Sequence, residues 1–142
     1  MLVHLVYASR IADGSACSEV IESILQQSRR HNPELGITGI LCHGSDFFMQ
    51  VLEGSRSAVN RLYTRIASDA RHRDVTLLHF EEIAERCCAA WTMGLVNLAK
   101  VNPSTVLKYS EQPRLDPFVI SGQASIALLR ELIATASIVG RN

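Results

Sequence analysis

The first segment of the chain, Leu2–Ala8, is mostly apolar and predicts a β-strand, in which successive side chains point to opposite faces. One face carries Val3, Leu5 and Tyr7, and the other carries Leu2, His4 and Val6. Because both faces are mostly apolar, this pattern predicts a strand in the middle of a sheet.

The next segment has apolar residues at helical spacing, and Ser15 or Ser18 can cap its first turn. The apolar stripe consists of Val20, Ile21, Ile24 and Leu25. Pro33 disfavours the α conformation at the preceding Asn32. We therefore expect this helix to run through about Arg30 and to end near His31.

Two runs of strand-forming residues follow, Ile37–Cys42 and Asp46–Glu53, joined by a short segment that contains Gly44. This arrangement predicts a β-hairpin. Side chains alternate along the second arm, so Phe48, Gln50 and Leu52 share one face. The hairpin thus places an uncharged amide inside an apolar strand.

Ser55 or Ser57 can begin a second helix that runs to about Asp69, because apolar residues recur at helical spacing. These residues are Val59, Leu62, Tyr63, Ile66, Ala67 and Ala70. Two further strands are predicted at Val75–Phe80 and Ala89–Asn97. In the last strand, Trp91, Met93 and Leu95 are expected on one face.

The predicted order of elements is β-α-β-β-α-β-β. With crossovers of the usual hand, this order gives a ferredoxin-like α/β (α+β) sandwich whose two helices cover one sheet face. After Asn97 several prolines interrupt the chain, and a helical pattern resumes over Ser121–Val139. We expect a domain over residues 1–97 and a C-terminal linker and helical extension over residues 98–142. The last helix should dock on the uncovered sheet face or on a partner.

The charges of the chain balance, with 14 Lys+Arg and 14 Asp+Glu among 142 residues. This balance argues against a general nucleic-acid or anionic-membrane binder. No apolar run approaches the ~20 residues needed to span a bilayer, and no segment resembles a signal peptide. We therefore expect a cytoplasmic protein.

The four cysteines, Cys17, Cys42, Cys87 and Cys88, form no C-x-x-C pair and have no histidine at zinc-like spacing. This pattern predicts buried or half-buried reduced thiols and no metal site.

A buried primary amide such as Gln50 needs hydrogen-bond partners, without which it costs about 1–3 kcal/mol. If the first strand and the second hairpin arm lie side by side, Tyr7 can donate to Gln50 in the layer of the two helices. The amide could then also bind a planar heteroaromatic ligand between the helices, with Asn32 at the rim. Taken singly, each residue also has an ordinary structural explanation. Tyr7 fits a core tyrosine, Gln50 fits an amide bonded to the backbone, and Asn32 fits a turn before Pro33.

Several short motifs, in this order along the chain, resemble the BLUF domain, a flavin-binding blue-light sensor. They are Tyr7-Ala8-Ser9-Arg10, His31-Asn32, Gly36-Ile37-Thr38-Gly39, Phe47-Phe48-Met49-Gln50-Val51-Leu52-Glu53-Gly54, Asp69-Ala70-Arg71-His72 and Trp91-Thr92-Met93. The resemblance covers about residues 1–97. The tail is similar to the short helical extension of stand-alone BLUF proteins.

The resemblance implies a flavin, usually FAD and alternatively FMN, between the two helices. It implies that Tyr7 is the light-driven donor of an electron and a proton, and that Gln50 is the amide that switches between Tyr7 and the flavin. The other implied cofactor-binding residues are His31 and Asn32 at the ring, Ile24 and Ile66 on the flanking helices, Phe48 on the Gln50 strand, and Arg65, Asp69, Arg71 and His72 on the ribityl and phosphate side.

Trp91 and Met93 are implied to relay the change at Gln50, because their strand is expected beside the strand of Gln50. A downstream signalling protein would receive the signal, and we expect a homo-oligomer. Since no substrate is consumed, the resemblance implies a photoreceptor and not an enzyme. Two other functions stay open, an acylphosphatase-like hydrolase and a non-photochemical flavin carrier. Gly36–Gly39 lacks the Gly-Lys-Ser/Thr companions of a phosphate loop.

Overall fold

The computed structural model describes residues 1–12, 17–135 and 137–140. Its sheet has five strands in the order β4-β1-β3-β2-β5. The strands are β1 (Leu2–Ile11), β2 (Thr38–His43), β3 (Phe47–Ser55), β4 (His72–Ile83) and β5 (Gly94–Asn97). Neighbouring strands are antiparallel, except that β5 runs parallel to β2.

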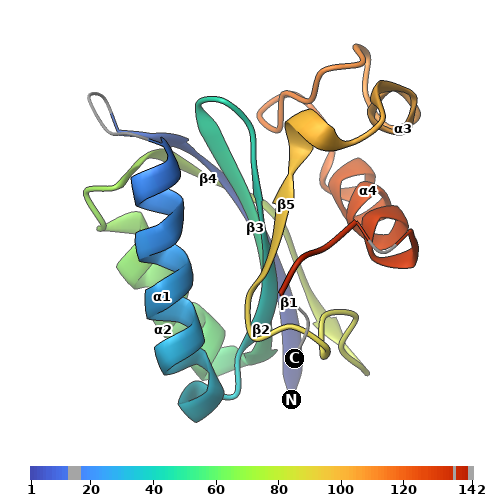
Figure 1. Ribbon diagram of the computed structural model, residues 1–142. Helices are drawn as coiled ribbons and strands as arrows, with labels where there is room; N and C mark the ends of the chain where they lie inside the picture. The colour runs from blue at the N-terminus through green and yellow to red at the C-terminus, as the bar shows by residue number, and fades with distance from the viewer. Residues whose placement is uncertain (13–16, 136, 141–142) are drawn as a thin grey trace.

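Helices cover both faces of this sheet (Figure 1). α1 (Cys17–Leu35) and α2 (Arg56–Ala67) lie on one face, and α3 (Pro103–Leu107) and α4 (Gly122–Ala134) lie on the other. A short 3-10 turn, η1 (Leu98–Lys100), links β5 to α3. The prediction of a ferredoxin-like sandwich with a C-terminal helix is therefore confirmed.

The alternation in β1 divides the apolar residues into two cores. Val3, Leu5 and Tyr7 pack on the side of α1 and α2, whereas Val6 packs on the side of α4. β1 lies between β4 and β3, which confirms the predicted central strand. The sheet interior is consequently shielded on both faces.

α4 packs on the sheet face that α1 and α2 leave uncovered, as one of the two sequence alternatives predicted. Ser121 caps its first turn by accepting a hydrogen bond from Ala124 N. Its buried apolar residues are Ile126, Leu128, Leu129 and Leu132, which join the core that contains Val6, Ile40, Cys42, Met49 and Val51. The helix ends at Ala134, short of the predicted Val139, and Val139 instead pairs through its backbone with Leu95 of β5.

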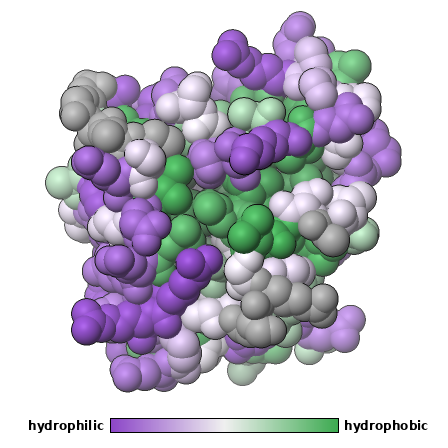
Figure 2. Space-filling view, viewed as in Figure 1, coloured by the Kyte–Doolittle hydropathy of each residue, from purple (hydrophilic) through white to green (hydrophobic). Residues whose placement is uncertain are grey.

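Figure 2 shows that polar and apolar residues gather on different parts of this face of the molecule. Hydrophilic residues dominate the outer side of α1, and apolar residues gather in the middle of the view, where the β5 edge lies in Figure 1. In this view the β5 edge is thus bordered by apolar surface, whereas the outer side of α1 is polar.

The end of α1 differs from the prediction. The helix does not stop near His31 but continues through Pro33 to Leu35. Gly36, with φ of +67°, closes it: Gly36 N donates to Pro33 O (3.3 Å) and Ile37 N donates to Asn32 O (3.0 Å). This glycine cap fixes the last turn and outweighs the local preference before proline. Of the two cap candidates, Ser15 lies outside the described residues and Ser18 lies inside α1.

The predicted fifth strand was wrong in its first half, because β5 begins only at Gly94. The irregular backbone before it breaks the period of two, so Trp91 packs in the α4 core and Met93 in the core of α1 and α2. The strand is also not beside β3, since β2 lies between them. Among the helices that the structure describes, none has the length and hydropathy needed to cross a membrane.

We predict that Leu128→Ala lowers the free energy of unfolding by about 2–5 kcal/mol, since this fully buried side chain would leave a cavity between α4 and the sheet. Urea unfolding followed by circular dichroism measures this. Leu107→Ala is the matched control, because Leu107 is 50% exposed and its loss should cost under about 0.5 kcal/mol. Equal effects of the two substitutions would show that α4 does not complete the core.

Candidate functional site

Tyr7 and Gln50 face one another across the two most buried strands. They are paired residues in the β1–β3 register, and their side chains are 0% and 2% exposed. The Tyr7 hydroxyl donates a hydrogen bond to Gln50 Oε1. In this contact the oxygen end of the amide accepts from the phenol, which leaves the nitrogen end to donate elsewhere.

The nitrogen end of the same amide points at Met93. Gln50 Nε2 donates to Met93 Sδ at 3.2 Å, although β2 separates the two strands. Gly39 of β2 makes this reach possible, because a Cβ atom at Gly39 would lie 3.2 Å from Met93 Cε and 2.2 Å from Val51 O. The buried amide therefore bridges a phenol and a thioether.

α1 holds the segment that carries Met93. Asn32 Nδ2 donates to Thr92 O at 3.1 Å, and Arg29 Nη2 donates to Met93 O at 3.3 Å. Asn32 lies within the longer α1 and is 2% exposed, so it faces the interior and not the turn expected from the sequence. The Gln50 amide, Met93 and α1 thus form one connected set of contacts.

A cavity of about 90 Å³ lies between α1 and α2 in front of Tyr7 and Gln50. All the predicted cofactor-binding residues except Phe48 line it, namely Tyr7, Ile24, His31, Asn32, Gln50, Arg65, Ile66, Asp69, Arg71 and His72. Phe48 is fully buried behind the cavity, with its ring 5.5 Å from that of His72. The structure therefore brings the predicted set together.

Four lining residues were not predicted, Gln27, Ser28, Leu35 and Leu62. Their signal is present in the sequence as helical spacing. Gln27, Ser28 and Leu35 repeat the face of α1 set by Ile24 and His31, and Leu62 lies one turn before Ile66 on α2.

The mouth of the cavity is charged. Arg71 Nη2 contacts Asp69 Oδ2 at 2.6 Å, and the same guanidinium donates to Ser23 Oγ (2.8 Å) and Gln27 Oε1 (2.7 Å) on α1. The hydrogen bond from Arg71 lowers the pKa of the Asp69 carboxyl. Arg71 thereby ties the segment after α2 to α1 across the mouth.

The inner wall is uncharged at neutral pH. Burial raises the pKa of Tyr7 well above its usual range, and burial lowers the pKa of His72 to about 4. His72 Nδ1 lies 2.7 Å from Ser9 Oγ, so the neutral ring shares a hydrogen bond with β1. Buried amides at one end and an Arg–Asp pair at the other suit a planar, polar-edged ring that carries a hydroxylated or phosphorylated chain.

The donor set fits a flavin, with two buried amides for the ring edge, Ile24 and Ile66 on opposite helices for its faces, and Arg65 and Arg71 for an anionic tail. Cofactor sites are typically about 300–1,000 Å³, larger than this cavity. A whole flavin therefore needs more room between α1 and α2 than this cavity offers.

Comparison with known families decides what this site belongs to. The family model described as BLUF, sensors of blue light using FAD, matches residues 2–94. The chain belongs to the BLUF family. The match spans β1 to β4 and both helices around the cavity, and it ends at the first residue of β5. It gives no support to the acylphosphatase-like hydrolase.

Curated relatives contain this domain in much longer proteins. The photoactivated adenylate cyclase subunit beta of Euglena gracilis is 40% identical over 74 residues, which are 51% of this chain and 9% of that protein. The blue light- and temperature-regulated antirepressor BluF of Escherichia coli (strain K12) is 35% identical over 78 residues, 55% of this chain and 19% of that protein. The match thus spans less than a fifth of either relative.

Two solved BLUF structures instead match over nearly their whole length. The photo-activated state of BlsA has a TM-score of 0.86 at 29% identity, covering 94% of this chain and 95% of its own. The dark state of BlrB has a TM-score of 0.78 at 30% identity, covering 95% of this chain and 96% of its own. The similarity therefore includes the C-terminal extension as well as the BLUF fold.

We predict that His72→Asn makes the BLUF chain less sensitive to mild acid. The pKa of His72 is about 4 in the folded chain and 6.5 ordinarily. Between these values the unfolded chain binds the proton more readily, so the wild type loses stability as the pH falls from 6.5 toward 4. Urea midpoints measured at pH 7 and pH 5 should fall more in the wild type than in the variant. Equal falls would contradict a buried neutral His72.

Proposed function

We propose that this BLUF chain is a blue-light photoreceptor in which Tyr7 and Gln50 form the photoactive pair and Met93 receives the change. The observation that carries the proposal is the buried Gln50 amide, which accepts from Tyr7 at one end and donates to Met93 Sδ at the other. Bound flavin supplies light absorption and, once excited, the oxidising power that takes an electron from a nearby tyrosine.

Tyr7 is suited to give that electron together with its proton. Its hydroxyl hydrogen already lies on the bond to Gln50 Oε1, so the proton moves along this bond to the amide as the electron leaves. The raised pKa of the phenol keeps Tyr7 protonated in the dark. The donor is therefore held in one protonation state and one hydrogen-bonded geometry before light arrives.

Gln50 is suited to switch because its two ends have opposite hydrogen-bond polarity. Turning or tautomerising the amide changes what it offers to Tyr7, to Met93 and to the cavity without changing its size or net charge. A turned amide directs its carbonyl oxygen at the Met93 sulfur, which is itself only a weak acceptor. The contact between the amide oxygen and the Met93 sulfur is then repulsive, which favours movement of the Met93 side chain.

Movement of Met93 has a short route to the surface. Met93 directly precedes Gly94 of β5, and the next residue, Leu95, pairs with Val139 near the C-terminus. We propose that this segment carries the signal to a protein partner, with residues 1–97 as the flavin-binding domain and 98–142 as the extension that presents it. Gln50 donates to Met93, whereas Trp91 packs in the core against α4, so we assign the relay to Met93 and a packing role to Trp91.

FAD is the proposed cofactor, in line with the description of the family. FMN is the alternative, and a structure of BlrP1 from Klebsiella pneumoniae was determined with FMN. We propose that the chain acts as a sensor without catalysis of its own, whereas the cyclase relatives are named for an enzymatic activity. The homo-oligomeric state and the cytoplasmic location stay predictions.

We predict that Tyr7→Phe and Gln50→Leu each bind flavin and each lose the light response. The wild type should show a small, reversible red shift of the flavin bands without bleaching, because only the hydrogen bonds at the ring change. Absorbance spectra recorded before and after blue light measure the shift.

Tyr63→Phe is the matched control, because the Tyr63 ring lies 5.8 Å from that of Tyr7 and its loss should leave the shift unchanged. A normal shift in Tyr7→Phe or Gln50→Leu would refute the assigned pair. Persistent bleaching of the wild type would instead indicate a flavin carrier with ordinary redox chemistry.

We predict that Met93→Leu keeps the red shift but alters the rate of dark recovery several-fold. Leucine preserves the volume of the side chain and removes the sulfur that accepts from Gln50 Nε2, so the dark orientation of the amide loses a partner. Recovery is followed at the red-shifted band after the light is switched off. Trp91→Phe is the control, and an equal or larger effect there would favour Trp91 as the relay.

A further inference from the structure

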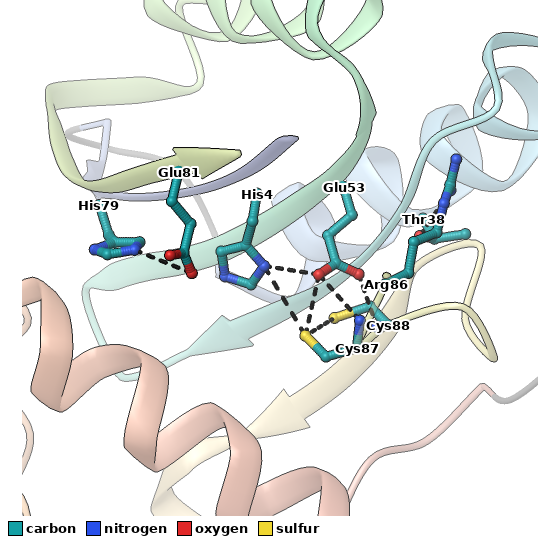
Figure 3. Close-up of polar contacts among 8 residues, drawn as sticks. All are labelled: His4, Thr38, Glu53, His79, Glu81, Arg86, Cys87 and Cys88. Carbon is teal, nitrogen blue, oxygen red and sulfur yellow. Dashed lines mark hydrogen bonds and ion pairs between the residues drawn. The ribbon is translucent and has the colours of Figure 1, made fainter. Parts of the chain in front are cut away.

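A second group of polar residues lies on the sheet face opposite the cavity, against the core of α4. Figure 3 shows His4 and Glu53 pointing toward the sulfur of Cys87. His4 and Glu53 are paired residues in the β1–β3 register, and Cys87 lies in the segment between β4 and β5. Three separate parts of the chain thus bring a nitrogen, an oxygen and a sulfur together.

The three atoms stand at distances close to those within a metal's coordination shell. Glu53 Oε2 lies 2.7 Å from His4 Nδ1 and 3.1 Å from Cys87 Sγ, and the sulfur lies 3.9 Å from His4 Nδ1. Tetrahedral zinc, with bonds of about 2.0–2.3 Å, separates its ligand atoms by about 3.3–3.8 Å. Side-chain shifts below about 1 Å therefore convert one arrangement into the other.

We propose that His4 Nδ1, Glu53 Oε2 and Cys87 Sγ bind a zinc ion, with water as the fourth ligand. Imidazole, carboxylate and thiolate are the ligand types that zinc prefers, and they are contributed here by one residue each. Cys88 is not assigned as a ligand, because the described donor atoms that all lie within 4.8 Å of one another belong to His4, Glu53 and Cys87.

The composition of the cluster suits a cation at its centre. A carboxylate and a thiol meet one imidazole in a region where Glu53 is 0% and His4 4% exposed. Zinc with one carboxylate and one thiolate is neutral overall, which favours burial.

The site is organised in advance and has an entrance. Glu53 Oε1 accepts from Cys88 N (2.7 Å) and Oε2 accepts from Cys87 N (3.2 Å), so the carboxylate already holds the segment that supplies the sulfur. Arg86 anchors the same segment by donating to Thr38 Oγ1 (3.0 Å) and Gly36 O (2.7 Å). Cys87 is half-buried, so the ion can enter past its side chain.

Zinc bound to Cys87 would also restrain the segment that leads to Met93, the residue proposed to receive the change at Gln50. Trp91 N donates to Cys88 O at 3.1 Å, and Met93 follows two residues later. Sequence spacing gave no sign of the site, because His4 and Glu53 are 49 residues apart and meet only through strand pairing. Binding itself does not depend on the proposed photochemistry.

The test is calorimetric titration of the full chain, stripped of metal and kept reduced, with zinc chloride. We expect one zinc per chain with micromolar or tighter affinity. Cys87→Ala should weaken binding beyond the roughly 10–100-fold typical of losing a residue that merely supports a ligand. Circular dichroism checks that this variant, altered in a connecting segment, remains folded. His43→Gln is the control for adventitious binding by another histidine and should bind as the wild type does.

X-ray absorption at the zinc edge then identifies the ligands. We expect one sulfur near 2.3 Å and three nitrogen or oxygen atoms near 2.0–2.1 Å. The proposal is overturned if the wild type binds no zinc at micromolar concentration or if folded Cys87→Ala binds it equally well. Two sulfur atoms in the shell would overturn the assignment of water as the fourth ligand.

Discussion

The antiparallel register of β1 and β3 is the constraint on which both polar sites of this molecule depend. It sets Tyr7 opposite Gln50 and His4 opposite Glu53. The two pairs are an odd number of residues apart on each strand, so they project from opposite faces of the sheet. A slip of one residue would turn every one of these side chains to the wrong core. The apolar residues that alternate with them hold the register.

Burial on both faces gives these pairs their chemical character. With α1 and α2 over one face and α4 over the other, water does not compete for the Gln50 amide or the Glu53 carboxylate. Each must find its partners within the protein, and each does, in Tyr7 with Met93 and in His4 with the Cys87–Cys88 segment. In a buried site hydrogen bonds are stronger than in water, so the two orientations of the Gln50 amide differ in their effect on its neighbours.

The sequence predicted much of this arrangement, for reasons that are local. The apolar pattern of Leu2–Ala8 predicted a central strand, the alternation along Asp46–Glu53 predicted the face of Gln50, and the motif set pointed to the residues of the cavity lining. It failed at the end of α1, where one local signal outweighs another. Pro33 suggested a helix end, but the glycine cap at Gly36 carries α1 to Leu35 and so moves Asn32 into the interior.

The relay residues show a second limit. A period of two placed Trp91 and Met93 together, and only the structure reveals that an irregular segment sends them to opposite cores. That Met93 crosses β2 to reach Gln50 depends on Gly39, whose role no pattern of hydropathy could indicate. The nearness of Cys87 to His4 and Glu53 likewise arises from tertiary structure alone.

The central claim is that light changes the hydrogen bonding of the Gln50 side chain. The most direct measurement is a light-minus-dark infrared difference spectrum of the flavin-loaded chain, with ¹³C in the side-chain carbonyl of glutamine. Our account predicts difference bands that shift with the isotope in the wild type and are absent from Gln50→Leu. A wild-type spectrum without isotope-sensitive bands, recorded while the flavin bands shift to the red, would contradict it.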